Sequence, residues 1–278
     1  MKLNENQAAL HSLAGLDYLS FKSFDETGLV RHLFSTRHGG VSVGPFASMD
    51  LSFNRGDDPD AVRENYRRIC AAAGIYPGNL VCAKQVHGTN IVYVDQRDRG
   101  KGVTAPNDLE DVDGLITDRP QVALVTFHAD CVPLFFLDPV KKVIGLAHAG
   151  WRGTVAGIGG KMVRRFRDDF GSDPSDILAG IGPSVGPCCF EVGPEVAEKF
   201  REAYPEIFHA NIILPGRREG KNQIDLWKAN AIDLMLAGIT RRNLSVAECC
   251  TCCQPEEFFS HRKTGNERGS MISLMELK

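Results

Sequence analysis

Residues 122–149 read VALVTFHADCVPLFFLDPVKKVIGLAHA, and this stretch decides the fold. Three runs within it, 122–127, 134–137 and 143–147, are rich in Val, Leu, Ile and Phe. Near-continuous apolar runs of this length are typical of central strands that are buried on both faces. We therefore expect the middle of the chain to form the core of a sheet.

Helical and strand patterns alternate around this core. Residues 58–73 predict a helix, because Asp58 can cap it, Pro59 suits its first turn and Gly74 can end it. Gly88-Thr89-Asn90 is a turn signal that predicts a hairpin of residues 80–87 and 91–94. Further helices are expected at 153–170, 194–204 and 225–237, and further strands at 29–35, 177–181, 258–261 and 271–277. The mixed order indicates an α+β (mixed α/β) fold, a layered sandwich.

Length and charge narrow the class of protein. With 278 residues and no repeat or linker, residues 1–278 are expected to form a single domain, with 1–25 either part of it or a peripheral extension. The net charge of −3 argues against a nucleic-acid partner, since such proteins usually carry a basic face. No apolar run approaches the ~20 residues of a membrane span, and the start lacks the pattern of a signal peptide. We expect a cytoplasmic protein without a membrane partner.

Nine cysteines are the unusual feature of the composition. In a reducing compartment, cysteines are more often metal-binding, catalytic or buried than disulfide-bonded. Cys249, Cys250, Cys252 and Cys253 form two overlapping C-x-x-C pairs. A structural zinc site normally needs a second such pair, and Cys188-Cys189 lacks that spacing. We expect packing cysteines here, with a redox dithiol or a non-catalytic metal-binding module as the alternative.

Three reactive side chains follow or end strand-like runs and have glycine nearby: His87, Cys131 and His148. Loops at strand ends are where scaffolds place functional groups, so the three can converge. Two imidazoles and one thiolate are good ligands for Zn²⁺, and three protein ligands leave a position open, as in catalytic zinc sites. Because 44 and 17 positions separate them, no local spacing rule supports the site. Ordinary core residues therefore remain the alternative at this point.

A set of motifs in one order covers the chain from about residue 30 to its end. They are Ser35 to Ser42, Gly56 to Pro59, Gln85 to Gly88, Asp113-Gly114, Ala129 to Cys131, His148 to Gly153, Gly182-Pro183, Cys188 to Val192, Cys250-Thr251 and Phe258 to Arg262. Together they resemble the laccase-domain family, also called the polyphenol-oxidase or YfiH/YlmD-like family.

The resemblance implies a zinc-dependent purine nucleoside phosphorylase that acts on adenosine, inosine and methylthioadenosine with phosphate, and that has adenosine deaminase activity. It implies His87, Cys131 and His148 as metal ligands and catalytic residues. The implied fold resembles a toxin deamidase with a Cys–His site. The partners would be purine nucleosides and phosphate, and the chain would be a monomer or homodimer.

Phosphate binding needs cations, and Arg37 and Arg152 are the candidates, because guanidinium binds phosphate oxygens in a fork. Arg37 has a second interpretation as support for the turn at Gly39-Gly40. Arg152 has another as a structural partner of Asp130 or Asp138. Asp130 itself is a candidate proton shuttle for deamination.

Two rival functions use the same residues. In a Cys–His hydrolase or amidase, Cys131 would be a nucleophile activated by His148. In a copper-dependent polyphenol oxidoreductase, Cu²⁺ would take the place of Zn²⁺, since a His₂Cys set also suits copper. The chain has eight histidines and no His-x-His pair, so a full laccase cycle is not expected.

Overall fold

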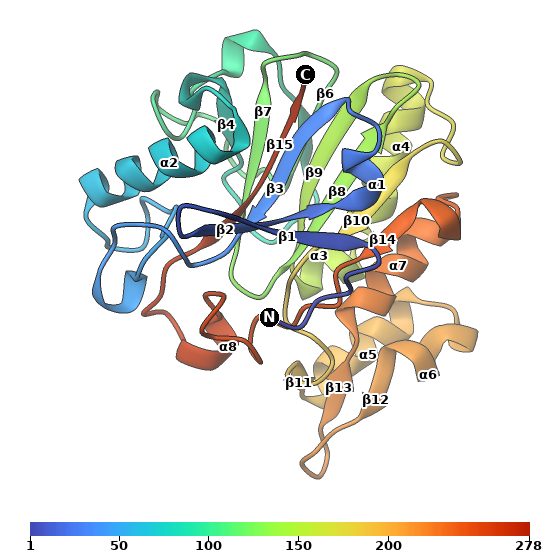
Figure 1. Ribbon diagram of the computed structural model, residues 1–278. Coiled ribbons are helices and arrows are strands. Elements are labelled where there is room, and N and C mark those ends of the chain that lie inside the picture. The colour runs from blue at the N-terminus through green and yellow to red at the C-terminus, as the bar shows by residue number, and fades with distance from the viewer.

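Two six-stranded sheets lie face to face in the computed structural model, which describes all residues 1–278 (Figure 1). The first sheet has the order β1 (Ala8–Leu13), β2 (Leu16–Phe21), β3 (Val30–Ser35), β15 (Met271–Leu277), β7 (Ala123–His128) and β4 (Leu80–Cys82). The second has the order β14 (Leu244–Val246), β10 (Leu178–Ile181), β8 (Val132–Asp138), β9 (Val143–Ala149), β6 (Gly114–Thr117) and β5 (Ile91–Tyr93). A small third sheet is formed by β11 (Glu191–Val192), β13 (Asn222–Ile224) and β12 (Ile213–Pro215). The expected mixed α+β class is confirmed.

The stretch at residues 122–149 forms β7, β8 and β9, as predicted, and it contributes to both large sheets. β7 pairs with β15 in the first sheet, whereas β8 and β9 pair antiparallel in the second. The chain therefore passes from one sheet to the other at residues 129–131. Asp130 and Cys131, from the motif at Ala129 to Cys131, lie at this crossing point.

α2 (Pro59–Ala73) covers the outer face of the first sheet, and α4 (Ile158–Phe170) and α7 (Leu226–Leu236) cover that of the second (Figure 1). The other helices are α1 (Lys22–Asp25), α3 (Trp151–Val155), α5 (Pro194–Ala203), α6 (His209–Ile212) and α8 (His261–Thr264). Asp58 caps α2 by accepting from the Asp60 N–H, and Gly74 ends it with φ 66°, a left-handed conformation that glycine adopts without steric cost. No helix is both long enough and apolar enough to cross a membrane.

Apolar side chains fill three layers. Phe34, Leu124 and Met275 of the first sheet meet Phe135 and Leu146 of the second. A second layer lies between α2 and the first sheet and includes Tyr66, Ile69 and Leu274. A third lies between the second sheet and α4 and α7 and includes Phe136, Phe166 and Leu234. Each fully buried side chain of this kind stabilises the fold by about 1.5–3 kcal/mol relative to its exposed state.

The predicted hairpin of residues 80–87 and 91–94 is wrong. β4 pairs with β7 in the first sheet, and β5 pairs with β6 in the second. Residues 83–90, between β4 and β5, do not pair as a hairpin. They form hydrogen bonds with residues that are distant in the sequence. Gln85 hydrogen-bonds both backbone groups of Phe127, at 2.6 and 2.8 Å, and the Asp113 carboxylate accepts the N–H groups of residues 86–88.

Two other elements differ from the prediction. Residues 258–261 are not a strand, because the chain there bends into α8, whose N-cap is Ser260. The expected helix at 153–170 is divided into α3 and α4, because Gly157 takes a φ of 70° between them. The division leaves α3 as a separate short helix that directly follows β9.

Candidate functional site

His87, Cys131 and His148 converge at one end of the two sheets, as the sequence predicts. One ligand atom from each lies within 4.8 Å of the other two. His87 comes from the loop after β4, Cys131 from the crossing before β8, and His148 from β9, where it pairs with Pro133. A Cβ on Gly150 would lie 2.8 Å from the His87 ring and 3.2 Å from the Cys131 sulfur. Glycine is therefore required there for the three side chains to meet.

Asp113 organises two of the three residues. Its carboxylate accepts a 2.8 Å hydrogen bond from His148 Nδ1, so the other ring nitrogen is left for the site. The same carboxylate accepts the backbone N–H of His87 at 3.0 Å and that of Gly88 at 2.7 Å. His87 has a φ of 64°, an uncommon conformation for a residue with a Cβ, and these bonds hold it there. Asp113 is fully buried, so both imidazoles depend on a rigid group.

The charges of the site favour a thiolate. Burial alone would raise the pKa of the Cys131 thiol, but the charge and hydrogen bond of His148 outweigh it and lower the pKa to about 6. Burial would lower the pKa of His148, but the Cys131 thiolate and Asp113 raise it to about 9. A thiolate beside two imidazoles, one of them oriented by a carboxylate, is a donor set that suits Zn²⁺ and also copper. The residues therefore fit a divalent metal ion.

Two neighbouring residues have structural roles. His128 is buried, and its ring nitrogens lie 2.8 Å from Thr126 Oγ1 and 3.2 Å from the Cys131 carbonyl oxygen, which agrees with the hydrogen-bonded histidine expected there. Asp130 accepts from the Thr251 hydroxyl at 2.6 Å and from the Arg262 N–H. Both Asp130 carboxylate oxygens are thus engaged in holding the C-terminal loops. A proton-shuttle role for Asp130 gains no support from this arrangement.

A cavity of about 1100 Å³ opens onto the three converging residues. Its lining draws on residues from Ser52 to Ser270 and includes the aromatic residues Phe127 and Phe190. Arg152 lines it and stacks over the Trp151 ring at 4.3 Å, with no ion pair to Asp130 or Asp138. Such a cavity is large enough for a nucleoside together with an anion.

Arg37 does not line this cavity, and its role as a phosphate ligand stays a prediction. Its guanidinium donates to the Ala47 carbonyl at 2.7 and 2.9 Å and to the Pro255 carbonyl at 2.7 Å, and it stacks over Phe259. These bonds join the loop after β3 to the C-terminal loops. These contacts favour the second interpretation of the sequence, in which Arg37 has a structural role.

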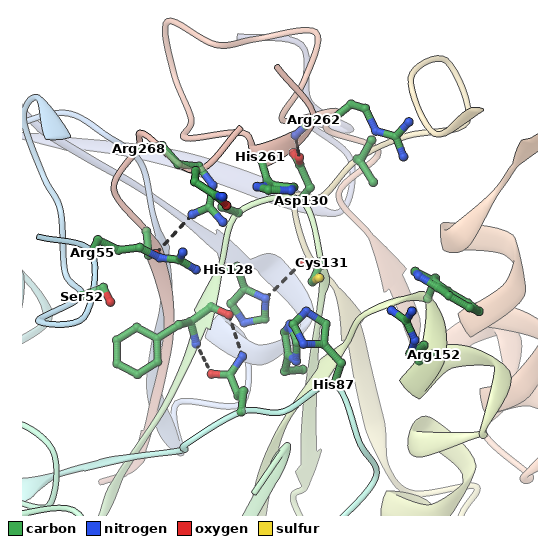
Figure 2. Close-up of a pocket in the computed structure, with 18 of the residues that line it drawn as sticks. Ser52, Arg55, His87, His128, Asp130, Cys131, Arg152, His261, Arg262 and Arg268 are labelled. Carbon is green, nitrogen blue, oxygen red and sulfur yellow. Dashed lines mark hydrogen bonds between the residues drawn. The ribbon is translucent and has the colours of Figure 1, made fainter. Parts of the chain in front are cut away.

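Two arginines that the sequence did not single out lie at the cavity instead. Arg268 is buried, with only 6% of its surface exposed, and its Nε has no hydrogen-bond partner. Burial, together with the charge of Arg55, lowers the pKa of Arg268 to about 10. Figure 2 shows Arg55 and Arg268 on one side of His87 and Cys131, with Arg152 on the other. A negatively charged ligand between Arg55 and Arg268 would relieve the repulsion between their charges.

The C-terminal cysteines depart in part from the expected packing role. Cys249 is buried, as packing requires, but Cys252 is half-buried and Cys253 is exposed. Cys250 and Cys253 meet Cys188 and Cys189, and the four sulfurs lie within 4.8 Å of one another. The second pair that a thiolate site needs is therefore present, because the fold joins segments whose spacing in the sequence gave no sign of it.

Comparisons with known proteins agree with this architecture. Residues 31–278 match the family model described as "Multi-copper polyphenol oxidoreductase laccase". "Purine nucleoside phosphorylase YlmD" of Geobacillus stearothermophilus is 40% identical over 87% of this chain and 88% of the relative. "Adenosine deaminase RL5" of an unknown prokaryotic organism is 33% identical over 85% and 90%. The crystal structure of the hypothetical protein YfiH of Bacillus licheniformis superposes with a TM-score of 0.89 at 33% identity and covers 97% of this chain and 99% of that one.

Proposed function

The chain belongs to the laccase-domain family, and from that premise we propose that it is a zinc-dependent purine nucleoside phosphorylase with adenosine deaminase activity. The observation that carries the proposal is the convergence of His87, Cys131 and His148 at a cavity that also holds cationic side chains. A purine nucleoside and phosphate need both features in one place. Adenosine, inosine and methylthioadenosine are the proposed substrates.

His87, Cys131 and His148 would hold the metal, with Asp113 fixing the orientation of the imidazoles. When bound, a metal of this class supplies a positive charge and acidifies water, which is what displacement of the 6-amino group of adenine requires. We propose that the purine packs against the aromatic residues Phe127 and Phe190 of the lining. Because the cavity takes residues from Ser52 to Ser270 and β1 to β3 belong to the same sheet as β15, we infer that residues 1–278 act as one domain.

Phosphorolysis needs phosphate placed beside the sugar. An oxygen of phosphate forms a bond to C1′ while the C1′–N9 bond breaks and the purine takes the electron pair. We propose that Arg55 and Arg268 bind the phosphate, because their charges face the same cavity and no carboxylate forms an ion pair with either. Arg152, the candidate from the sequence, lies on the other side of the cavity and is the alternative phosphate ligand.

Purified enzyme given inosine is expected to release hypoxanthine and ribose 1-phosphate only when phosphate is present. Adenosine without phosphate is expected to yield inosine and ammonia, because water alone is the second substrate of that reaction. Both rates would be followed by chromatography of bases and nucleosides, with zinc and copper measured in the same protein. Hypoxanthine release that does not depend on phosphate would contradict phosphorolysis.

Arg268→Gln is expected to raise the KM for phosphate about 10-fold or more with a smaller effect on the KM for inosine. A hydrogen bond from a charged donor contributes about 1.5–3 kcal/mol, which corresponds to this range. Arg55→Gln is a companion variant, since Arg55 is exposed and its removal should spare the fold. The measurement is the initial rate over a phosphate titration.

Arg152→Gln and Arg37→Gln complete the series. If Arg152→Gln raises the KM for phosphate and the Arg268 variant does not, phosphate binds at the Arg152 end of the cavity. Arg37→Gln is the matched control for loss of a guanidinium outside the cavity. It should leave the KM for phosphate unchanged and lower the melting temperature, because three hydrogen bonds to carbonyl groups are lost.

A Cys–His hydrolase is the second candidate, and one observation favours it. Cys131, His148 and Asp113 form an ion-paired chain that resembles a nucleophile, base and orienting carboxylate. The implied likeness to a Cys–His toxin deamidase belongs with this candidate. The hydrolase would turn over after chelation of metal, and iodoacetamide would block Cys131 rapidly in the protein as purified. In the phosphorylase, chelation would stop turnover and bound metal would slow the alkylation.

A further inference from the structure

Four cysteine sulfurs meet at a surface that is separate from the lining of the cavity. Cys188, Cys189, Cys250 and Cys253 have all four sulfurs within 4.8 Å of one another. The sulfur of Cys253 lies 3.3 Å from that of Cys188 and also 3.3 Å from that of Cys189. Four sulfurs bound at about 2.3 Å to one tetrahedral ion would lie about 3.8 Å apart. The observed separations are close to what such a site requires.

The backbone holds the two cysteine pairs in place before any ligand binds. Gly186 accepts the N–H groups of Cys189 and Phe190, which closes a turn around Cys188. Thr251 and Ser184 are joined by a 3.1 Å backbone hydrogen bond, in register with the bridge between Ser184 and Cys250. The two turns that carry the sulfurs are therefore fixed side by side.

A backbone donor is also aimed at one of the sulfurs. The Gly186 N–H donates to Cys250 Sγ at 3.2 Å in a buried position. A Cβ on Gly186 would lie 2.7 Å from the Trp227 ring and 3.2 Å from the Cys250 Cβ, so only glycine allows this approach. Hydrogen bonds to ligating groups orient them and stabilise their charge in metal sites.

Packing does not explain the cluster. Packing cysteines behave as small apolar side chains in the interior, but Cys253 is exposed and Cys188 and Cys189 are half-buried. A single disulfide does not explain it either. Cys253 is equally far from two partners, and both separations exceed the S–S bond of about 2.05 Å.

We propose that Cys188, Cys189, Cys250 and Cys253 form a second, structural metal site that takes Zn²⁺ through four thiolates. On binding, the four thiols release their protons to solvent, so the site carries two negative charges. With four protein ligands, no position is open for substrate, and the site is not catalytic. This inference does not depend on the proposed function of the cavity.

We expect the bound metal to fix the position of two chain segments that form one wall of the cavity. Phe190, Glu191 and Val192 follow Cys189 directly and line the cavity, and Thr251 binds Asp130 at its rim. Because the metal ties these two segments together, its loss should lower the melting temperature and raise the KM for nucleoside more than it lowers kcat. Metal binding of this kind adds directly to the free energy of folding.

The test is zinc per chain, measured by native mass spectrometry on protein purified without added metal. Wild type should hold two ions, Cys131→Ala one, the double variant Cys188→Ser/Cys253→Ser one, and the combination none. Cys252→Ser is the matched control, since Cys252 adjoins the cluster without belonging to it, and it should keep two ions. A cluster variant that keeps the wild-type zinc content would overturn the proposal.

A second measurement does not require the cluster variants to fold. X-ray absorption at the zinc edge of Cys131→Ala should show a single ion with four sulfur neighbours at about 2.3 Å. If purified Cys131→Ala holds no zinc and has two fewer free thiols than expected, the cluster contains a disulfide. That result would refute the metal site. Absence of metal at His87, Cys131 and His148 with one ion at the cluster would refute the proposed function alone.

Discussion

Cys131→Ala is expected to remove the metal from the cavity site and to lower kcat/KM for inosine and adenosine by more than about 100-fold. Loss of a group that merely supports a metal ligand already costs roughly 10–100-fold in affinity or activity, and Cys131 is proposed to be a ligand itself. It is also the one anionic donor beside two imidazoles, so its removal leaves only neutral ligands for a divalent ion. Metal content and both activities would be measured on the same sample.

The control for Cys131→Ala is Cys70→Ala. Cys70 is buried in α2, where burial raises the pKa of its thiol to about 12, so it is an inert cysteine, and it does not line the cavity. This variant should keep the wild-type metal content and kcat/KM and show only a modest loss of stability. Full phosphorolysis by Cys131→Ala without bound metal would contradict the proposed function.

Asp113→Asn should weaken zinc binding at the cavity site about 10–100-fold, with activity restored by excess zinc. The two Asp113 oxygens accept four hydrogen bonds, from His148 Nδ1 and from the N–H groups of residues 86–88. The amide nitrogen of asparagine would face donors in either orientation, so at least one buried donor is left unpaired. That costs about 1–3 kcal/mol and frees the His148 ring to turn.

A competition assay with a chromophoric chelator would give the zinc affinity of this variant. Asp111→Asn is the matched control, because Asp111 is exposed and has a φ of 54°, a conformation that asparagine tolerates. It should bind zinc as wild type does. If Asp113→Asn lost activity and excess zinc failed to restore it, Asp113 would act on the fold and not on the metal ligands.

The central strands could be predicted from the sequence because their signal is local. The apolar runs at 122–127, 134–137 and 143–147 need no distant partner to be identified as buried strands. The helix α2 is predicted equally well, since its cap, first turn and end residue are adjacent to it. The hairpin at 80–94 failed for the opposite reason. Asp113, which lies elsewhere in the chain, binds the backbone N–H groups at the expected turn.

The site was predictable only through the family motifs. Spacing alone left His87, Cys131 and His148 undecided, and the fold brings them together where the chain passes between sheets. Arg268 was missed because no motif surrounds it and its proposed role rests on burial beside Arg55. The position of Arg37 outside the cavity could not be predicted, because a guanidinium that binds carbonyl groups and one that binds phosphate have the same sequence signature.

Because β15 is a central strand of the first sheet, that sheet cannot be completed until the C-terminal end of the chain has been synthesised. β15 lies between β3 and β7, although residues 36–270 separate it from β3. At roughly 5–20 residues per second, β7 waits roughly 7–30 s on the ribosome before residue 277 is made. Throughout that interval β3 and β7 each present an unpaired edge, which is the feature that drives strand-to-strand aggregation. Nascent chains of this protein should therefore depend on chaperones, and a product cut short before residue 271 should precipitate.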